Sequence, residues 1–331
     1  MVRIVVDAMG GDFAPEVNVA GALAALQEFP DVHLILSGPQ GALVKELAKH
    51  NYDQSRIEVD DAPDTVAMDE HPGRVVRSKP NSSVVRSAQL VKDGIADAGL
   101  SAGNTGAAMA SALFKIGRIS GVDRPAIGVP LPAAGRFFLL VDGGANADCR
   151  PIHLMQFAKM GSIYAEEVLK VTNPKVGLLN IGEEAEKGNE LVKEVHQMLA
   201  NQEGLNFIGN IEGNDIPAGT ADVVVCDGFV GNIVLKLVEG MWSQFGRTLK
   251  KTIFSGPTGK ASGLLVKNNL VKMKQSLDYA EHGGAPLLGI NGVYIISHGR
   301  SNAKAIKNAI RVARDGVLSG YVEKLKTAIK S

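Results

Sequence analysis

The sequence predicts an α/β protein built on a mostly parallel sheet with helices on both faces. Short apolar segments of the strand type alternate with longer segments of the helix type along the 331 residues, which is typical of parallel sheets. Glycine occurs 38 times and aromatic residues make up only 5% of the chain, which suits many tight strand-to-helix turns. Since 45% of the residues are hydrophobic, the chain can bury a large core, and we expect one domain over residues 1–331.

Each strand is expected where a short apolar run precedes a turn. The expected strands are Val2–Val6, Val32–Leu36, Arg56–Val59, Ala98–Ser101, Ala126–Leu131, Phe137–Val141, Val176–Ile181, Phe207–Ile208 and Val223–Cys226. Helices are expected where capping residues and glycines bound longer segments. They are Pro15–Gln27, a helix ending near His50, one capped by Asn81 or Ser82 that runs to Lys92, Ala107–Ile116, Pro151–Lys170, Gly188–Ala200, a long helix starting within 227–232, and Ser301–Lys326. We expect 62–80 to be irregular and 240–285 to form a helical protrusion for a membrane, partner or dimer contact.

The charge balance and the cysteines narrow the class of protein. Lys+Arg and Asp+Glu both number 35, so no overall charge favours nucleic acid, and any basic patch must be local. Cys149 and Cys226 form neither a disulfide framework nor a metal-binding spacing. Met1 leads directly into an expected strand, and no apolar run is long enough to span a bilayer. We therefore expect a cytoplasmic protein.

Five expected strands end in glycine together with Asp, Asn or Glu, within residues 7–12, 101–106, 142–148, 181–188 and 227–232. In parallel α/β sheets, ligands bind beyond the carboxyl ends of the strands. Such turns also serve plain chain reversal. Because five of them are expected at the same edge, we predict a ligand site there.

The stretch Ala96–Ile116 is the clearest candidate for holding an anion. A strand ending at Ser101 leads through a glycine-rich turn into a helix with small residues in its first turn. The unpaired N–H groups and the dipole of a helix start attract an anion, and small residues allow it to approach closely. The alternative is an ordinary turn in which Asn104 or Thr105 caps the helix.

Other chemistries are less well supported. Gly99–Gly103 matches the G-x-S-x-G elbow of serine hydrolases, with Ser101 as nucleophile and Asp227 and His282 or His298 as its partners. Neither nucleotide-binding fingerprint occurs and no zinc spacing is present, so we expect no cofactor. Four aspartates, Asp7, Asp12, Asp142 and Asp227, would hold Mg²⁺ if they converged. We favour roles in orienting cations or capping helices, and expect no metal.

Two basic regions stand out. In the last helix, five cations share one face through spacings of four, three, four and three: Arg300, Lys304, Lys307, Arg311 and Arg314. Residues 247–277 contain seven cations and no acid. They also carry an amphipathic stripe, Val266, Leu270, Met273 and Leu277. Solvated faces, a membrane surface, an acidic partner and a subunit interface all remain open.

Four motifs together resemble the bacterial phosphate acyltransferase family (PlsX). They are Asp7-Ala8-Met9-Gly10-Gly11-Asp12, Ser101-Ala102-Gly103-Asn104-Thr105-Gly106-Ala107, Asn180-Ile181-Gly182-Glu183-Glu184 with Lys187-Gly188, and Ala221-Asp222-Val223 through Asp227-Gly228-Phe229-Val230-Gly231-Asn232. The resemblance implies a fold like the isocitrate/isopropylmalate dehydrogenases and transfer of a fatty acyl group from acyl-[acyl carrier protein] to inorganic phosphate. It also implies a homodimer that visits the membrane peripherally, where a membrane acyltransferase consumes the acyl phosphate.

The implied reaction gives the candidate residues roles. Phosphate is itself the nucleophile, so catalysis depends on holding it against the thioester and stabilising the oxyanion. The expected phosphate- and acyl-binding residues are Asp7, Asp12, Lys79, Asn104, Thr105, Gly106, Asp142, Asn146 and Arg300. The expected catalytic residues are Lys187, Asp227, Asn232 and His298, of which Asn232 or His298 donates to the oxyanion. Because the carrier protein is acidic, we expect it to dock on Lys304, Lys307, Arg311 and Arg314, and the stripe of Val266, Leu270, Met273 and Leu277 to contact the membrane.

Overall fold

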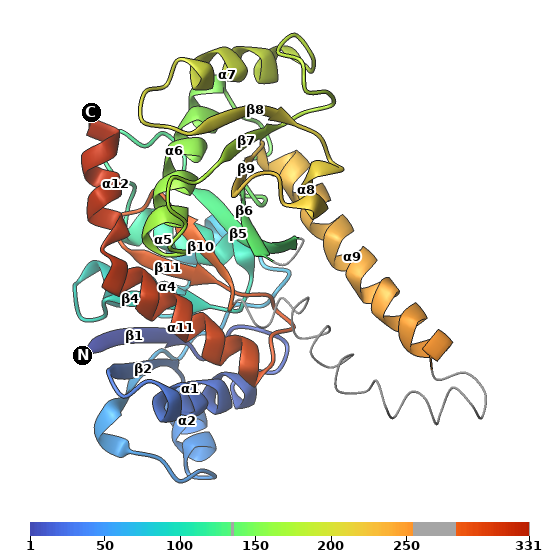
Figure 1. Cartoon of the computed structure of the whole chain (residues 1–331). Helices are drawn as coiled ribbons and strands as arrows, with labels where there is room; N and C mark the ends of the chain where they lie inside the picture. The colour runs from blue at the N-terminus through green and yellow to red at the C-terminus, as the bar shows by residue number, and fades with distance from the viewer. Residues whose placement is uncertain (134–135, 254–282, 331) are drawn as a thin grey trace.

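A single sheet organises the protein (Figure 1). The computed structural model describes residues 1–133, 136–253 and 283–330, and within these ranges the strands form one eleven-stranded sheet in the order β3-β2-β1-β4-β11-β10-β5-β6-β9-β7-β8. The strands are β1 (Val2–Asp7), β2 (Val32–Gly38), β3 (Ile57–Asp61), β4 (Ala98–Ser101), β5 (Ala126–Ala133), β6 (Arg136–Val141), β7 (Val176–Leu179), β8 (Phe207–Ile211), β9 (Val223–Val225), β10 (Ala285–Leu288) and β11 (Val293–Ile296).

The sheet consists of two parallel blocks joined by an antiparallel centre. Neighbouring strands are parallel in the block β3-β2-β1-β4-β11 and again in the block β6-β9-β7-β8. Between the blocks, the pairs β11–β10, β10–β5 and β5–β6 are antiparallel. The prediction of a mostly parallel sheet is confirmed. Because three reversals follow one another, however, the two blocks run in opposite directions, which the sequence did not indicate.

Helices cover both faces of the sheet, as predicted. They are α1 (Glu16–Glu28), α2 (Gln40–Leu47), the 3₁₀ helix η1 (Gln54–Arg56), α3 (Pro72–Ser78), α4 (Ser83–Lys92), α5 (Thr105–Lys115), α6 (Pro151–Glu167), α7 (Glu190–Ala200), α8 (Asp215–Ala218), α9 (Gly228–Ile253), α11 (Ala303–Ser319) and α12 (Tyr321–Lys330). Alternation along β1 shows how both faces are filled. Ile4 and Val6 join the core under α1 and α11, whereas Val5 packs with Leu90 of α4. Each fully buried side chain of this kind contributes about 1.5–3 kcal/mol.

Three elements differ from the sequence-based expectation. Residues 62–80, which were expected to be irregular, contain the helix α3, with Pro72 in its first turn. The strands β10 and β11, which lie between the long helix and the last helix, were not expected. The expected last helix is two helices: Gly320 adopts a left-handed conformation with φ of 67° and ends α11 before α12 begins.

The helix α9 leaves the body of the protein and projects to one side (Figure 1). Its 26 residues confirm the expected long helix, and its last part, 240–253, falls within the stretch 240–285 that was expected to protrude. The proposed membrane residues Val266, Leu270, Met273 and Leu277 lie outside the described residues. Among the helices that the structure does describe, none is long and apolar enough to cross a membrane.

Candidate active site

A cleft of about 350 Å³ lies between the antiparallel centre of the sheet and the first turns of α9. Its polar lining is formed by Thr105, Asn232, Lys236, Glu239, Ser297 and His298, together with Gly143 and Gly144. Its apolar wall is formed mainly by Ile127, Val129, Pro130, Leu131, Leu235 and Ile296. The cleft therefore joins residues that follow β4, β11, β6 and β9. Its size and mixed lining are those of a small-molecule site.

The turn after β4 is an ordinary capped helix start that still presents N–H groups. Asn104 Oδ1 accepts a hydrogen bond from Ala107 N at 3.0 Å, so Asn104 is the N-cap of α5. Its Nδ2 donates to Met68 O at 2.8 Å and to Glu70 O at 3.1 Å. The Asn104 side chain therefore ties the turn to residues 68–70. The N–H groups of Thr105 and Gly106 precede the first intrahelical hydrogen bonds and remain suited to an anion.

Ser101 is not placed as a nucleophile. Its side chain is fully buried, and Oγ donates to Asp7 Oδ2 at 2.6 Å while accepting from Gly103 N at 3.1 Å. Burial raises the pKa of the Asp7 carboxyl above its ordinary value, against the opposing effect of the Ser101 hydrogen bond. An acyl group would have to reach Ser101 through packed residues. The geometry gives no support to a serine hydrolase, and it makes Asp7 a structural acceptor beneath the turn.

Asp142 organises the turn that follows β6. Its Oδ1 accepts hydrogen bonds from the backbone N–H groups of Ile127, Gly144 and Ala145 at 3.0–3.2 Å. Its Oδ2 accepts from the backbone N of Asn146 at 2.7 Å and from Asn146 Nδ2 at 2.9 Å. Asp142 is fully buried, and burial raises the pKa of its carboxyl. Asp142 and Asn146 thus shape the glycine turn that lines the cleft, and neither residue lines it directly.

The loop after β11 places an imidazole at the cleft. His298 Nδ1 accepts a hydrogen bond from Arg300 N at 3.0 Å, so the neutral ring carries its proton on Nε2. Arg300 is 80% exposed, and its Nε lies 4.0 Å from Asp12 Oδ2, the outer limit of an ion pair. The Asp12 N–H donates to Gly299 O at 2.8 Å. The loops containing Asp12 and Arg300 are therefore joined beside the cleft.

The first turns of α9 supply a second polar group and a cation. Asp227 Oδ1 accepts from Val230 N at 2.8 Å and so caps the start of α9. Asn232 is exposed and lines the cleft, and Lys236, one turn later, lines it as well. Glu239 also lines the cleft and adds a negative charge three residues after Lys236. Sequence reasoning identified Asn232 but missed Lys236. Lys236 could have been found from its position four residues after Asn232, because this spacing places two side chains on the same face of a helix.

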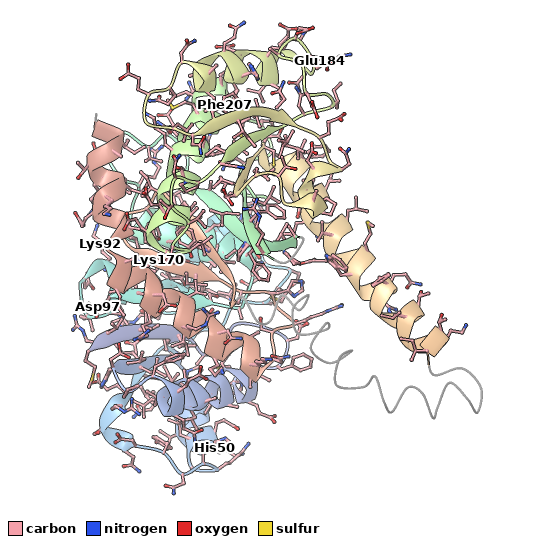
Figure 2. All side chains as sticks on the ribbon, viewed as in Figure 1. His50, Lys92, Asp97, Lys170, Glu184 and Phe207 are labelled. Carbon is pink, nitrogen blue, oxygen red and sulfur yellow. The ribbon has the colours of Figure 1, made fainter. Side chains whose placement is uncertain are left out.

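Two expected charged residues lie away from the cleft. Lys79 Nζ contacts Glu70 Oε1 at 2.7 Å and Thr65 O at 2.8 Å, and it does not line the cleft. Lys187 is exposed in the loop between β7 and α7. That loop also carries Glu184, at the α7 end of the molecule (Figure 2). The structure thus gathers Thr105, Asn232 and His298 at the cleft. It places the 142–146 turn beside them and does not bring Lys187 to the same pocket.

Three of the four cations expected to bind the carrier on α11 form ion pairs within the protein. Lys307 Nζ lies 2.5 Å from Glu28 Oε2, and Arg314 Nε lies 2.9 Å from Asp31 Oδ1. Arg311 lies 3.8 Å from Asp315. These contacts follow from the packing of α11 along α1. The face that looked uniformly cationic in sequence is partly neutralised by α1 and the turn after it.

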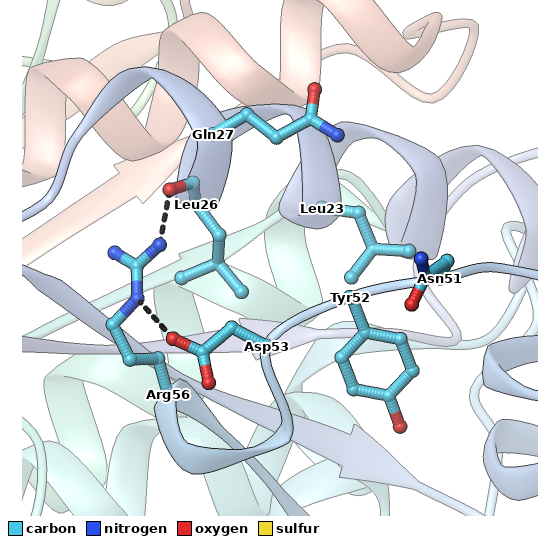
Figure 3. Close-up of a pocket in the computed structure, with 7 residues that line it drawn as sticks. All are labelled: Leu23, Leu26, Gln27, Asn51, Tyr52, Asp53 and Arg56. Carbon is cyan, nitrogen blue, oxygen red and sulfur yellow. Dashed lines mark hydrogen bonds and ion pairs between the residues drawn. The ribbon is translucent and has the colours of Figure 1, made fainter.

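A second pocket, of about 340 Å³, is lined by Leu23, Leu26, Gln27, Asn51, Tyr52, Asp53 and Arg56 (Figure 3). It lies near the starts of β2 and β3 and therefore at the opposite ends of these strands from the turn after β1. The Arg56 guanidinium is already engaged by Asp53 Oδ2 at 3.2 Å and by the carbonyls of Leu26 and Phe29. The pocket thus offers no unengaged charge for an anion.

Within the described ranges, no group of three or more His, Cys, Asp or Glu residues is placed to hold a metal ion. The four aspartates considered for Mg²⁺ do not converge there. Asp7 and Asp142 accept hydrogen bonds in the interior, and Asp227 caps α9. Capping, one of the roles that we favoured, fits Asp227, whereas the printed partners of Asp7 and Asp142 in the described part of the chain are N–H and O–H donors and not cations.

Solved structures share the fold. A phosphotransacetylase from Streptococcus pyogenes aligns with a TM-score of 0.64 at 16% identity, covering 96% of this chain and 94% of that chain. The EutD phosphotransacetylase from Staphylococcus aureus gives 0.60 at 19% identity, with the same coverage. A putative 4-hydroxythreonine-4-phosphate dehydrogenase from Salmonella typhimurium gives 0.56 at 12% identity, covering 95% and 98%. The expected dehydrogenase-like α/β fold is confirmed.

Sequence comparison identifies the family. Residues 2–324 match the family described as "Fatty acid synthesis protein". A phosphate acyltransferase of Desulfitobacterium hafniense is 52% identical over 325 residues, covering 98% of this chain and 96% of the relative. Those of Gloeobacter violaceus and Clostridium novyi are 50% and 47% identical, covering 98% and 99% of this chain and 96% and 98% of the relatives. The chain therefore belongs to the phosphate acyltransferase family.

Proposed function

We propose that the cleft transfers a fatty acyl group from an acyl-[acyl carrier protein] thioester to inorganic phosphate. A phosphate oxygen attacks the thioester carbon, the carbon–sulfur bond breaks, and the carrier leaves as its thiol after gaining a proton. The second pKa of phosphate is about 6 to 7, near that of a phosphate ester, so much of it is a dianion at neutral pH. The nucleophile therefore needs positioning and not activation by an acylated side chain.

One observation carries this proposal: the cleft joins a helix start and polar donors to an apolar wall. The N–H groups of Thr105 and Gly106 suit the phosphate, with Lys236 of the cleft and Arg300 beside it as sources of positive charge. The Nε2 proton of His298 and the amide of Asn232 suit the oxyanion that develops on the thioester oxygen. The wall of Ile127, Val129 and Leu131 suits the start of an acyl chain.

The decisive assay is phosphate-dependent release of carrier thiol, with the acyl phosphate trapped by hydroxylamine. Removing one oxyanion donor in other acyl-transfer enzymes lowers kcat on the order of 10²–10³-fold, and we expect such a loss for His298→Ala or Asn232→Ala. The same assay decides the sequence-based roles of Asn104, Lys187 and Arg300. If alanine at each of these three left turnover within a few-fold of wild type, they would not belong to the site. Thiol release that needed no phosphate would refute the proposed reaction itself.

We also propose that α9 and the region after it make the contacts expected of a peripheral, homodimeric enzyme. One face of α9 packs on the body through Val234, Leu235 and Val238. The helix also exposes large apolar side chains at a spacing of four residues: Ile233, Leu237, Met241 and Phe245, each at least half exposed. Such a continuous apolar patch marks an interface.

Two measurements separate a subunit contact from a membrane contact. Leu237→Asp with Met241→Asp should convert a dimer to a monomer in sedimentation equilibrium if α9 pairs the subunits. Leu270→Glu should weaken flotation with anionic vesicles if the 266–277 stripe binds the bilayer. Full vesicle binding by Leu270→Glu would reject that stripe. Membrane contact would bring the acyl phosphate to the membrane acyltransferase that uses it, while the enzyme itself remains cytoplasmic.

A further inference from the structure

We propose that the exposed face of α3, marked by Arg74 and Arg77, is the surface on which the acidic carrier protein docks. The inference rests on the proposed function and locates one of its steps, the delivery of the acyl thioester to the cleft. It also moves the docking surface away from α11, where the sequence placed it.

Two contacts attach α3 and the segment before it to the turn that carries Thr105. A Cβ atom on Gly106 would overlap Pro72, the first residue of α3, so the start of α3 lies directly against the first turn of α5. Asn104 Nδ2 holds the preceding segment by donating to Met68 O and Glu70 O. Because Thr105 lines the cleft, a partner seated on α3 would lie beside the cleft opening.

The exposed side of α3 is cationic. Val75 is buried against α5, whereas Arg74 and Arg77 are exposed and, three residues apart, share the opposite side of the helix. Within the described part of the chain, neither guanidinium forms an ion pair or a hydrogen bond. The nearby Lys79 forms an ion pair with Glu70. Asp69, in the segment before α3, is an exposed acidic residue.

The contrast with α11 decides between the two surfaces. Lys307 and Arg314 are only 22% and 26% exposed and are held by Glu28 and Asp31. To bind an acidic partner, these cations would have to exchange an internal pair for an external one, which gains little. Among the described residues, Arg74 and Arg77 have no such pair to break, so they can steer an acidic surface directly.

Apolar side chains complete the rim. Met68 is 48% exposed. A Cβ atom added to Gly299 would lie only 2.8 Å from Met68 Cε, so Met68 packs against the loop that carries Gly299. Phe13 is 57% exposed and follows Asp12, whose N–H donates to Gly299 O. Met68 and Phe13 therefore flank the loop of His298 and Arg300. A protein partner that contacts apolar as well as cationic groups fits this rim better than a free anion does.

The test is the double variant Arg74→Glu/Arg77→Glu, assayed for phosphate-dependent thiol release. We expect KM for the acyl-carrier substrate to rise on the order of tenfold at low salt, and the difference from wild type to shrink as salt increases. The kcat, the KM for phosphate, and kcat/KM for a carrier-free acyl pantetheine thioester should each stay within about twofold. Lys45→Glu/Lys92→Glu makes the same charge change on exposed residues of α2 and α4 and should leave every constant unchanged. Lys92 is labelled in Figure 2.

Several results would overturn the proposal. An unchanged KM for the acyl-carrier substrate would do so, as would an equal loss with the carrier-free thioester, since α3 would then act on the cleft itself. If Lys304→Glu/Arg311→Glu raised KM and the α3 variant did not, the carrier would dock on α11. Should the glutamate variant fold poorly, Arg74→Gln/Arg77→Gln must still raise KM in a salt-dependent way. Failure of the proposed function would be distinct, because wild type itself would then release no thiol in response to phosphate.

Discussion

The clearest test of how the site is built is to remove the carboxylate of Asp142. Five N–H groups donate to this buried side chain, four from the backbone and one from the amide of Asn146. Among the residues that the structure describes, no lysine or arginine contacts it. We therefore infer that Asp142 holds the turn that lines the cleft, in contrast to the sequence-based expectation that it orients cations and binds substrate.

The structure sets the size of the effect. In Asp142→Asn, the remaining oxygen can serve the three donors at Oδ1, and the new amide faces two donors of Asn146. Two hydrogen bonds are lost, each worth about 0.5–1.5 kcal/mol, or more because the acceptor was charged. We expect a loss of about 2–3 kcal/mol. Asp142→Ala leaves all five donors without this acceptor, including the N–H of Ile127 at a buried strand residue, and should cost roughly 4 kcal/mol or more.

Urea unfolding at neutral pH measures these losses as shifts of the midpoint at an unchanged m value. In parallel, thiol release is measured per folded molecule. If Asp142 holds the turn, the asparagine variant loses stability and keeps a substantial fraction of its kcat, and the alanine variant is worse in both. If instead Asp142→Asn abolishes turnover while the free energy of unfolding changes by less than about 0.5 kcal/mol, Asp142 acts on substrate or on a cation, and our inference is wrong.

Three further predictions concern the turns beside the cleft. Wild type should not be labelled at Ser101 by a fluorophosphonate, and Ser101→Ala should keep turnover while losing about 1–3 kcal/mol of stability, because the buried Asp7 carboxyl loses a donor. Labelling at Ser101 would contradict its burial. Burial raises the pKa of Asp7 above 3.8, so the folded state retains a proton that the unfolded state has released. Stability should therefore fall as pH rises from about 3.8 to the raised pKa, and Asp7→Asn should flatten this slope in urea midpoints across that range. Gly106→Ala should cost about 1–3 kcal/mol by forcing Pro72 and α3 outward, and an unchanged midpoint would show that α3 is not packed there.

The strand ends show how far the sequence could lead. The pattern of apolar runs followed by glycine with Asp or Asn located the turns after β1, β4, β6 and β9. It did not separate residues that bind ligand from residues that hold the turn. Asn104, Asp142 and Asp227 each accept backbone N–H groups in the structure. The oxygen atoms that suit a cap suit a ligand equally well, and only the positions of the donors decide between them.

The sequence also did not predict how strands that are distant in the chain pair with each other. Shortness alone does not explain the missed strands, because the equally short β4 and β9 were expected. The strand β10 pairs with β5, whose residues lie far away in the chain, and that pairing leaves no local pattern. Whether β5 and β6 pair in antiparallel fashion depends on neighbours far away in the chain. The break at Gly320 was equally hidden, since a single glycine can continue a helix or end it. These features determine the reversal between the two blocks, and the reversal determines which strand ends face each other.

That reversal explains why the candidate site depends on α9. Thr105 and His298 follow strands of one block, whereas Gly144 and Asn232 follow strands of the other. A single parallel block would present only one of these sets. The apolar wall comes from β5 in the antiparallel centre and is closed by Leu235 of α9. The polar groups and the apolar wall therefore meet only when the first turns of α9 are packed on the sheet. A partner or membrane contact that displaced α9 would also displace Asn232, Leu235 and Lys236, and so would change the lining of the cleft.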